Sequence, residues 1–354
     1  MTKIFYGGSM IQIDGSFGEG GGQILRTSIG LSLVTRKPFK IKNIRSKRKK
    51  PGLMRQHLTA VNAAVKISNA EVKGNSICSK ELEFEPSKTV SGNYHFSIGT
   101  AGSATLVLQT LLPALMIADG DSKLVIEGGT HNPYSPPFHF LEKSFLRLLN
   151  QLGPKIEVKL LDYGFYPAGG GKIEISIHPA KKLKPFLTRA KQIKQIKSLC
   201  LTSMIPFFIA EKESKIIRDA LKISEENAQA LEVESRGPGN IAMIEIETAD
   251  HVELISSFGE KGIPLNKVAK SGVQMAKRYI ESKGALGHHL ADQILIPLAL
   301  AGGGCFTTLK PSLHTLTNIE MIKKFLDVNI QVKEIEQDYY QIEITGGSNE
   351  MGKT

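Results

Sequence analysis

The chain has 354 residues, 41% of them hydrophobic, so it is long enough to bury more than one core, and we expect two compact units. Its 45 Lys and Arg exceed its 34 Asp and Glu by a formal charge of +11, which favours a polyanionic partner such as a nucleic acid or nucleotide over a merely basic surface. No apolar run approaches the roughly 20 residues of a membrane span, which excludes a membrane protein. The scattered cysteines Cys78, Cys200 and Cys305 are typical of reduced thiols, and we expect a soluble cytoplasmic protein without a signal peptide.

Helical and strand-like patterns alternate along the chain, with glycine-containing breaks between them. In chain order, they predict a helix at 23–34, a strand at 39–44, helices at 55–67 and 103–118, a strand at 123–127, a helix at 137–152, strands at 156–161, 172–178 and 241–248, helices at 268–282, 288–301 and 316–326, and a strand at 339–344. This alternation indicates an α+β fold with α/β-like packed layers, and its recurrence suggests internal duplication.

The composition changes near residues 179–195, where prolines and lysines are frequent. The segment that follows closes near residues 262–265. We therefore predict a smaller domain at 185–266, inserted into a larger, discontinuous domain made of residues 1–184 and 267–354.

A glycine cluster runs from Asp14 to Gln23, after a strand-like run and at the start of a predicted helix. Glycines let backbone amides approach an anion closely, and a helix N-terminus adds a favourable partial charge. A phosphate cradle is one interpretation, and a sharp turn that needs glycine for its backbone angles is an equally good one. A second pattern, G-x-x-x-x-G-K-[ST] at 347–354, is rejected as a phosphate loop because no helix follows it.

The stretch from Gly20 to Ala70 contains no Asp or Glu. It holds twelve cationic residues: Arg26, Arg36, Lys37, Lys40, Lys42, Arg45, Lys47, Arg48, Lys49, Lys50, Arg55 and Lys66. Because this run adjoins the glycine cluster, it favours phosphate or nucleic-acid binding over a solvated basic face.

Two residues in the last third could carry chemistry. Asp292 offers oxygens that a divalent cation prefers, and His314 offers an imidazole nitrogen that is available as a nucleophile near neutral pH. Each, taken singly, is more often a cap or a surface residue. The proline-rich run at 128–137 predicts a rigid loop, either as the wall of a base pocket or as a stiff connector.

Six motifs together resemble the RNA 3′-terminal phosphate cyclases, and the resemblance spans nearly the whole chain but is thin between 188 and 265. They lie at 14–26, 50–58, 99–103, 165–171, 290–293 and 312–318. The resemblance implies a large domain of three repeated βαβαββ-like units and a smaller inserted α/β domain, similar to the enolpyruvyl transferases. It also implies an enzyme that uses ATP with Mg²⁺ or Mn²⁺ to convert an RNA 3′-terminal phosphate into a 2′,3′-cyclic phosphodiester. The implied route runs through a histidine–AMP adduct and an RNA-adenylate, and it releases pyrophosphate and AMP.

The resemblance also assigns roles by position. His314 matches the nucleophile, accompanied by the catalytic residues Arg26, Arg45, Arg48 and Gln56. Glu19 and Asp292 match metal ligands. The nucleotide contacts fall on Gln109, Pro136, His289, Leu290, Ala291, Asp292 and Gln293. The family often has a tyrosine where this chain has His289, so the stacking surface on the base is smaller here.

Two rivals remain. A non-catalytic cyclase-like RNA-binding protein of ribosome biogenesis would lack the histidine nucleophile, whereas His314 is present. An enolpyruvyl transferase would share phosphate-binding arginines but would need no covalent adenylate. The oligomeric state is left open.

Overall fold

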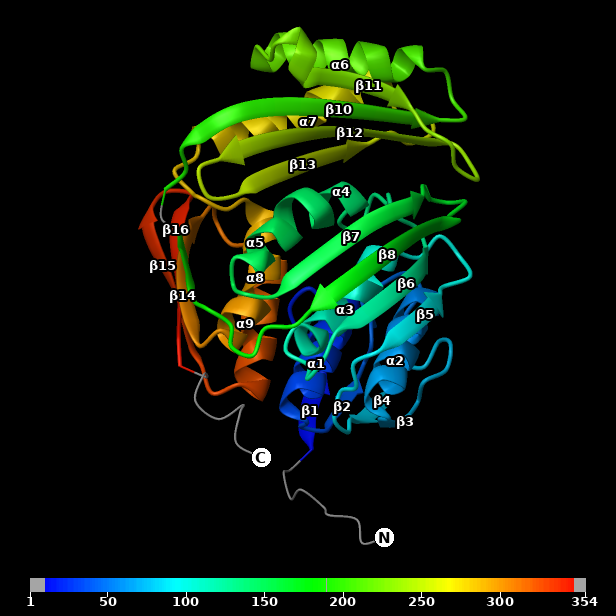
Figure 1. Cartoon of the computed structure of the whole chain (residues 1–354), viewed down its shortest axis with the longest axis vertical. Coiled ribbons are helices and arrows are strands. Elements are labelled where there is room, and N and C mark those ends of the chain that lie inside the picture. The colour runs from blue at the N-terminus through cyan, green and yellow to red at the C-terminus, as the bar shows by residue number, and fades with distance from the viewer. Residues whose placement is uncertain (1–9, 189, 347–354) are drawn as a thin grey trace, which may run out of the picture.

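The computed structural model describes residues 10–188 and 190–346, so the pattern at 347–354 lies outside the described residues. Three four-stranded sheets surround a group of helices, and a fourth sheet forms a separate layer at one end (Figure 1). No helix in the described part of the chain is long and apolar enough to cross a membrane.

The first sheet has the strand order β1-β2-β4-β3. Its segment runs through β1 (Ile11–Asp14), α1 (Gly22–Thr35), β2 (Phe39–Lys42), α2 (Arg55–Ser68), β3 (Glu71–Lys73) and β4 (Leu82–Glu85). The pair β1 and β2 is parallel, as a strand–helix–strand connection requires, and the remaining pairs are antiparallel.

The second and third sheets, β5-β6-β8-β7 and β9-β14-β16-β15, have the same order and the same pattern of directions. The second segment comprises β5 (Asn93–Ser97), α3 (Ala104–Leu115), β6 (Ser122–Gly128), α4 (Phe138–Phe140), the π-helical turn η1 (Leu141–Phe145), α5 (Leu146–Asn150), β7 (Lys155–Asp162) and β8 (Gly171–His178). The third comprises β9 (Phe186–Thr188), α8 (His288–Leu300), β14 (Gly303–Thr308), α9 (Leu313–Phe325), β15 (Asn329–Glu336) and β16 (Tyr339–Thr345).

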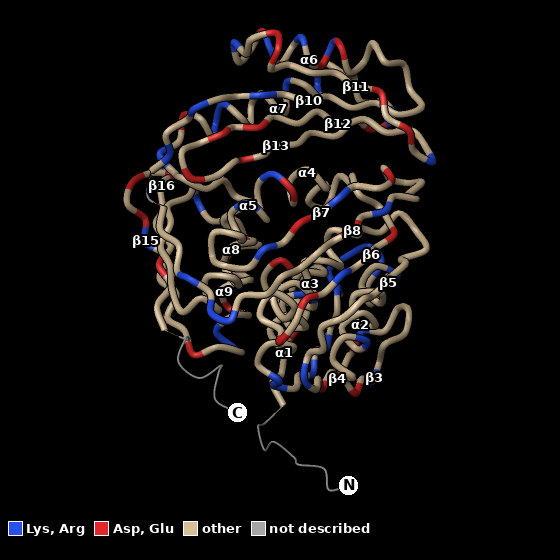
Figure 2. The backbone as a smooth tube through the Cα atoms, in the orientation of Figure 1, with Lys and Arg blue, Asp and Glu red and all other residues tan. Residues whose placement is uncertain are grey.

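The fourth sheet, β11-β10-β12-β13, interrupts the third segment between β9 and α8. It is built from β10 (Ile193–Ser203), α6 (Phe208–Leu221), η2 (Glu225–Asn227), β11 (Ala228–Glu232), β12 (Gly239–Thr248), β13 (Val252–Phe258) and α7 (Leu265–Glu281). Both signs of charge, Lys and Arg as well as Asp and Glu, occur across this layer (Figure 2). It therefore has none of the one-sided charge of residues 20–70.

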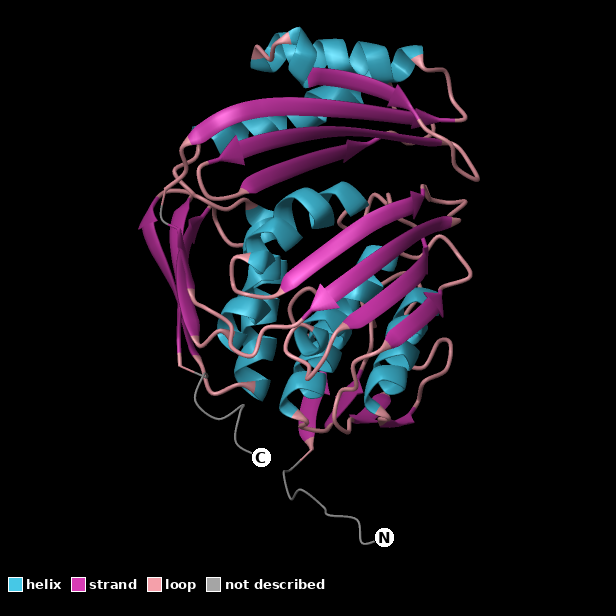
Figure 3. Ribbon diagram, viewed as in Figure 1, coloured by secondary structure: helices cyan, strands magenta, loops and turns pink. Residues whose placement is uncertain are grey.

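Two apolar clusters hold these layers together. The larger one lies among the first three sheets, where α1 packs against α3 and α9 (Figure 3). The smaller one lies between the fourth sheet and its helices, and it includes Val268, Val273 and Tyr279 of α7. This cluster extends past residue 266 into α7 and also includes Leu309, which follows β14. The domain bounds at 184–185 and 266–267 stay a prediction.

Every helix predicted from the sequence is present in the structure, although its first and last residues differ from the predicted ones. The helix predicted at 316–326 begins at Leu313, because Ser312 accepts a hydrogen bond from the Thr315 amide (3.1 Å) and caps it. His314 consequently lies in the first turn of α9. The helix predicted at 137–152 is divided by the π turn η1, and α6 and several short strands were not predicted.

Candidate active site

The glycine cluster forms a tight loop that rests against α9. Gly18 and Gly20 have φ angles of +51° and +63°, which favour glycine. A Cβ at Gly18 would lie 2.2 Å from Thr317 Oγ1, and the same oxygen accepts a hydrogen bond from the Glu19 amide at 3.1 Å. This close approach fixes the position of Glu19 beside the start of α9.

The loop carries a carboxylate, that of Glu19, beside the start of α1. Glu19 Oε2 accepts a hydrogen bond from the Gly21 amide at 2.7 Å, and Oε1 forms an ion pair with Arg48. The glycines thus serve turn geometry and close packing around Glu19, and phosphate binding by this loop stays a prediction.

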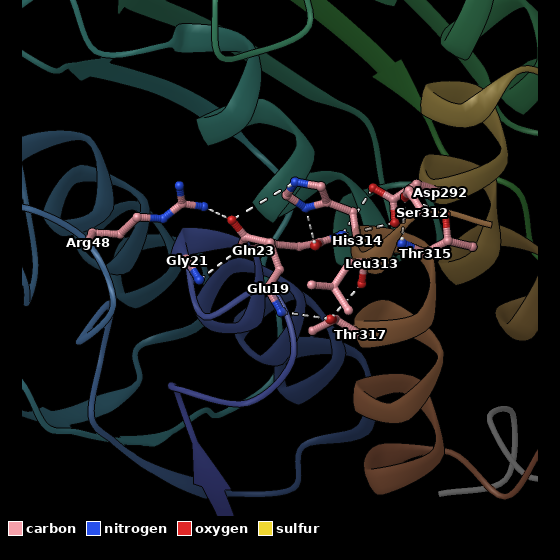
Figure 4. A network of polar contacts seen from close by, with 10 residues as sticks. All are labelled: Glu19, Gly21, Gln23, Arg48, Asp292, Ser312, Leu313, His314, Thr315 and Thr317. Atoms are coloured by element: carbon pink, nitrogen blue, oxygen red, sulfur yellow. Dashed lines mark hydrogen bonds and ion pairs between the residues drawn. The ribbon is translucent and has the colours of Figure 1, made fainter. Parts of the chain in front are cut away.

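His314 is held by a chain of side-chain hydrogen bonds that joins three helices (Figure 4). Its Nδ1 lies 2.8 Å from Oε1 of Gln23, which is in the first turn of α1. Gln23 Nε2 in turn donates to both carboxylate oxygens of Asp292 on α8, at 2.9 and 3.0 Å. Residues 23, 292 and 314 are far apart in the sequence, and only the packing of α1, α8 and α9 brings them together.

This chain of hydrogen bonds selects one form of the imidazole. An ionised carboxylate only accepts, so Asp292 fixes the Gln23 amide with its nitrogen toward α8 and its oxygen toward His314. That oxygen also only accepts, so the proton on the neutral His314 ring must be on Nδ1. Nε2 keeps its lone pair.

His314 Nε2 faces a charged but accessible environment. The side chain is 53% exposed, and Nε2 lies 4.0 Å from Glu19 Oε1. Partial removal from water, followed by the positive charges of Arg26 and Arg48, lowers the pKa of His314 below its ordinary value. The neutral, nucleophilic form is therefore favoured at neutral pH.

Asp292 and Arg26 lie on neighbouring helices behind His314. Burial raises the pKa of Asp292 to about 6, and hydrogen bonding by Gln23 and the charge of Arg26 oppose that rise. Burial lowers the pKa of Arg26 to about 10, so its guanidinium stays charged at neutral pH. One negative and one positive group thus remain in this part of the site.

A cavity of about 490 Å³ opens in front of these residues. Eight of the residues that the sequence singled out line it: Arg26, Arg48, Gln109, Pro136, His289, Asp292, Gln293 and His314. Gln109 and Gln293 are joined by a hydrogen bond across it. The volume is in the range of small-molecule sites.

The other predicted residues lie around this cavity and do not line it. Leu290 and Ala291 are buried in the apolar core behind α8. Arg45 Nη1 donates to the carbonyls of Lys50 and Gly52, at 2.8 Å each, and Gln56 Oε1 accepts from the Ser103 amide at 2.8 Å. Both polar side chains therefore hold loops beside the site.

The donors that could hold a metal are carboxylates already engaged in hydrogen bonds. Within residues 10–188 and 190–346, no three His, Cys, Asp or Glu side chains form a ready metal cluster. Mg²⁺ usually takes one or two protein carboxylates and completes its shell with substrate phosphates and water. Glu19, at the mouth of the cavity, fits that role when a phosphate group supplies the remaining oxygens.

A larger hollow of about 770 Å³ lies elsewhere, between α6, α7 and the turn from β15 to β16. None of the residues predicted for chemistry lines it. Two of its four lining cations are paired with acids: Arg278 with Asp338 at 3.1 Å, and Lys283 with Glu336. The convergence of polar side chains from three helices favours the smaller cavity as the active site.

Several important residues were not singled out in the sequence. Gln23 and Asn318 stand inside recognised motifs but received no role; Asn318 accepts from Thr27 Oγ1 (2.8 Å) and donates to the Asp292 carbonyl (3.0 Å). Leu254, Ser256 and Phe258 of β13 line the cavity from the fourth sheet. Their strand has no motif, so no sequence signal could have placed them there.

Comparisons with known proteins point to one family. The family model for RNA 3′-terminal phosphate cyclase matches residues 17–332. Proteins named RNA 3′-terminal phosphate cyclase are 48% identical in Koribacter versatilis (93% of each chain) and 43% identical in Ectopseudomonas mendocina (95% of this chain, 98% of that one). One from Salmonella enteritidis is 42% identical over 93% of this chain and 97% of its own.

A solved EPSP synthase from Acinetobacter baumannii aligns with 92% of this chain and 62% of its own, at 11% identity and a TM-score of 0.28. A superposition this weak supports no conclusion about fold or function. The matching family model and the relatives, in contrast, cover nearly the whole chain at high identity. The chain therefore belongs to the RNA 3′-terminal phosphate cyclase family.

Proposed function

We propose that this protein uses ATP to convert an RNA 3′-terminal phosphate into a 2′,3′-cyclic phosphodiester, through a covalent adenylate on His314. The observation that carries the proposal is the hydrogen-bond chain from Asp292 through Gln23 to His314 Nδ1, which leaves Nε2 free at a cavity of nucleotide size. Membership of the cyclase family supports the same reaction.

In the first step, His314 Nε2 attacks the α-phosphorus of ATP. A nitrogen–phosphorus bond forms, and the bond from that phosphorus to the pyrophosphate oxygen breaks. The ring becomes positively charged because Nδ1 keeps its proton, and Gln23 Oε1 is in position to stabilise that proton at 2.8 Å. Covalent capture of AMP divides one difficult activation into easier steps.

In the second step, an oxygen of the RNA 3′-phosphate takes the AMP from His314 and regenerates the neutral ring. The neighbouring ribose 2′-hydroxyl oxygen then bonds to the activated 3′-phosphorus, and the bond from that phosphorus to the AMP oxygen breaks. The hydroxyl proton passes to the departing AMP or to solvent, and the cyclic ester forms. Because the hydroxyl and the phosphate belong to one ribose, the ring closure is intramolecular and gains from proximity.

Cationic side chains at the cavity are suited to the charge that moves among phosphoryl oxygens. Arg26 and Arg48 both line the cavity on the His314 side. Bound Mg²⁺ or Mn²⁺ would mask phosphate charge and polarise the phosphoryl group. Glu19 would hold the ion at its Oε1, and release from the ion pair with Arg48 would free that guanidinium for phosphate.

We place the adenine of ATP between Pro136 and His289, which line the cavity from separate segments. Gln109 and Gln293 offer amide groups to the base or ribose from α3 and α8. The side chains of Leu290 and Ala291 face the core, so their contribution would come from the backbone at the start of α8. The shared position of the other four residues in the lining of one cavity supports this placement.

The finer fold proposal is that the three sheets with equal strand order are repeated βαβαββ units, arranged as in the enolpyruvyl transferases. Equal order and equal directions in β1–β4, β5–β8 and the set β9, β14, β15 and β16 support the repeat. The fourth sheet is then an insertion between β9 and α8 of the third unit.

Incubation with α-labelled ATP and Mg²⁺ or Mn²⁺ tests the proposal. Wild-type protein should retain label after denaturation, and RNA with a 3′-phosphate should discharge it, whereas RNA ending in a 3′-hydroxyl should not. His314→Ala should retain none, while His95→Ala, which alters an exposed histidine in β5, should label normally. If wild-type protein never labels with either metal, the covalent mechanism is wrong and a non-catalytic RNA-binding relative becomes the better interpretation.

A further inference from the structure

A basic surface lies directly beside the candidate active site. It consists of residues 45–50, here named the basic loop, together with Arg55 at the start of α2. Lys47, Lys49, Lys50 and Arg55 are all exposed. Among residues 10–188 and 190–346, no acidic side chain forms an ion pair with any of these four.

Hydrogen bonds hold the backbone of the basic loop in one conformation. Arg45 adopts a left-handed backbone with φ of +52°, and its guanidinium donates to the carbonyls of Lys50 and Gly52. The Arg48 amide donates to the Arg45 carbonyl at 3.0 Å, and the Gly52 amide donates to the Ile44 carbonyl at 2.8 Å. These bonds fix the backbone, so less conformational freedom is lost when the lysines meet a ligand.

The basic loop is continuous with the site. Arg48 reaches from it to Glu19, close to His314 (Figure 4). The stem of Lys47 lies over the glycine loop, where a Cβ on Gly20 would be 3.0 Å from Lys47 Cδ. Lys47 and Arg48 of the basic loop thus both reach the glycine loop that carries Glu19.

The acidic groups around the basic loop are few. Glu19 is already paired with Arg48, and the carboxylate of Asp14 accepts from Ser16 and Asn43. The larger hollow near α7 is different, because its Lys283 pairs with Glu336 and its Arg278 with Asp338. In the described part of the chain, the basic loop therefore combines unpaired positive charge with contact to the site.

We propose that the basic loop and Arg55 bind the phosphodiester backbone of the RNA on the 5′ side of its terminal phosphate. The inference rests on the proposed function, because the strand is located by its 3′ end at His314. Lysines bind phosphates through charge and read no base, so the surface takes single strands of any sequence. Affinity should rise with strand length until the surface is filled.

The test compares two double variants that each remove two exposed positive charges. Lys47→Ala with Lys49→Ala alters the basic loop, and Lys197→Ala with Lys215→Ala alters β10 and α6 of the fourth sheet. Each is assayed with an oligoribonucleotide and with a dinucleotide, both ending in a 3′-phosphate, over a range of salt concentrations. Labelling by ATP alone is measured in parallel.

We expect the basic-loop variant to raise KM for the oligoribonucleotide roughly tenfold at low salt, and to lower the salt dependence of binding by about 0.7 in slope for each RNA phosphate that a lysine no longer neutralises. The dinucleotide reaction and the labelling by ATP should match wild type, as should all properties of the control variant.

An unchanged KM for the oligoribonucleotide would overturn the inference, and so would an equal loss with the dinucleotide, because the lysines would then act on the terminal phosphate. Loss of ATP labelling would assign the surface to the nucleotide and overturn it as well. Failure of wild-type protein to label would instead count against the proposed function, so the two failures are distinguishable.

Discussion

Two clusters of hydrogen-bonded side chains, each containing histidine, have opposite surroundings in this molecule. At the candidate site, His314 Nδ1 is bound to Gln23 while Nε2 is open to the cavity. Beneath the proline-rich wall of the same cavity, His131 Nε2 lies 3.0 Å from His139 Nδ1, and His131 Nδ1 lies 2.9 Å from Thr130 Oγ1. Both nitrogens of His131 are therefore used inside the protein.

In the buried cluster the histidine pKa values are strongly lowered, but the rings are closed off from the cavity. Burial lowers the pKa of His139 to about 4 and lowers that of His131 well below its ordinary value. The rings of Tyr163 and Phe165 each lie 5.3 Å from the His131 ring. The pKa of His314 is lowered too, but its side chain is 53% exposed. A perturbed pKa by itself thus does not mark a nucleophile; a free nitrogen that faces a cavity does.

The largest expected effect comes from making the His314 ring free to turn. Gln23→Leu keeps a side chain of similar size but removes the acceptor that fixes Nδ1–H, so we expect the rate of labelling by ATP to fall about a hundredfold. Rapid-quench labelling at saturating ATP measures it. Gln12→Leu, on the exposed side of β1, is the matched control.

A Gln23→Leu rate within twofold of wild type, where about a hundredfold is expected, would show that the hydrogen bond does not select the nucleophilic nitrogen. The difference between the two clusters would then rest on exposure alone. A lower kcat with unchanged KM for ATP would locate the effect in the chemical step.

The second expected effect concerns the buried pair. His139→Leu leaves the inward nitrogen of His131 without its partner, and we expect the free energy of unfolding to fall by about 1–3 kcal/mol. Urea denaturation measures it. His95→Leu makes the same change at an exposed histidine and should stay within about 0.5 kcal/mol of wild type.

Labelling by ATP should survive in His139→Leu at a temperature where the variant is folded. Loss of labelling in the folded variant would contradict the view that this pair supports structure only, and would make it a positioning element of the proline-rich wall.

The smallest expected effect is on pH dependence. Neutral His314 is the reactive form and its pKa is lowered, so labelling should persist below the ordinary histidine pKa of about 6.5 and decline only in more acidic solution. Removing the positive charge in Arg48→Ala raises the pKa of His314, so the acid decline should move to higher pH. Arg55→Ala, with its charge on α2, should leave the profile in place.

The sequence located the elements well where the apolar pattern is long, as in the helices now numbered α1, α2, α3, α8 and α9. Short strands such as β3 and β9, at three residues each, carry too little pattern to be predicted. The helix α6 was missed, although its buried face packs on β10 and β11. Tertiary contacts, rather than local preference, give these segments their conformation.

For the site, the sequence supplied the residue types and the motifs. It singled out His314, Asp292, Glu19, Arg26 and Arg48, and the structure brings all five around one cavity or its mouth. The motifs did not indicate where the side chains of Arg45 and Gln56 point. In the structure, both side chains form hydrogen bonds with neighbouring backbone groups. Motif membership alone does not say which way a side chain points.

By itself, the sequence determined the family, the layered α+β class and the concentration of positive charge between residues 20 and 70, because these depend on local composition and motif. The packing of α1, α8 and α9 decided that Gln23 joins His314 to Asp292, across separations of 291 and 269 residues. The tertiary structure also decided that β13 of the fourth sheet lines the cavity. Hydrogen bonds of this kind depend on distances of a few ångströms between helices, which only the assembled core fixes.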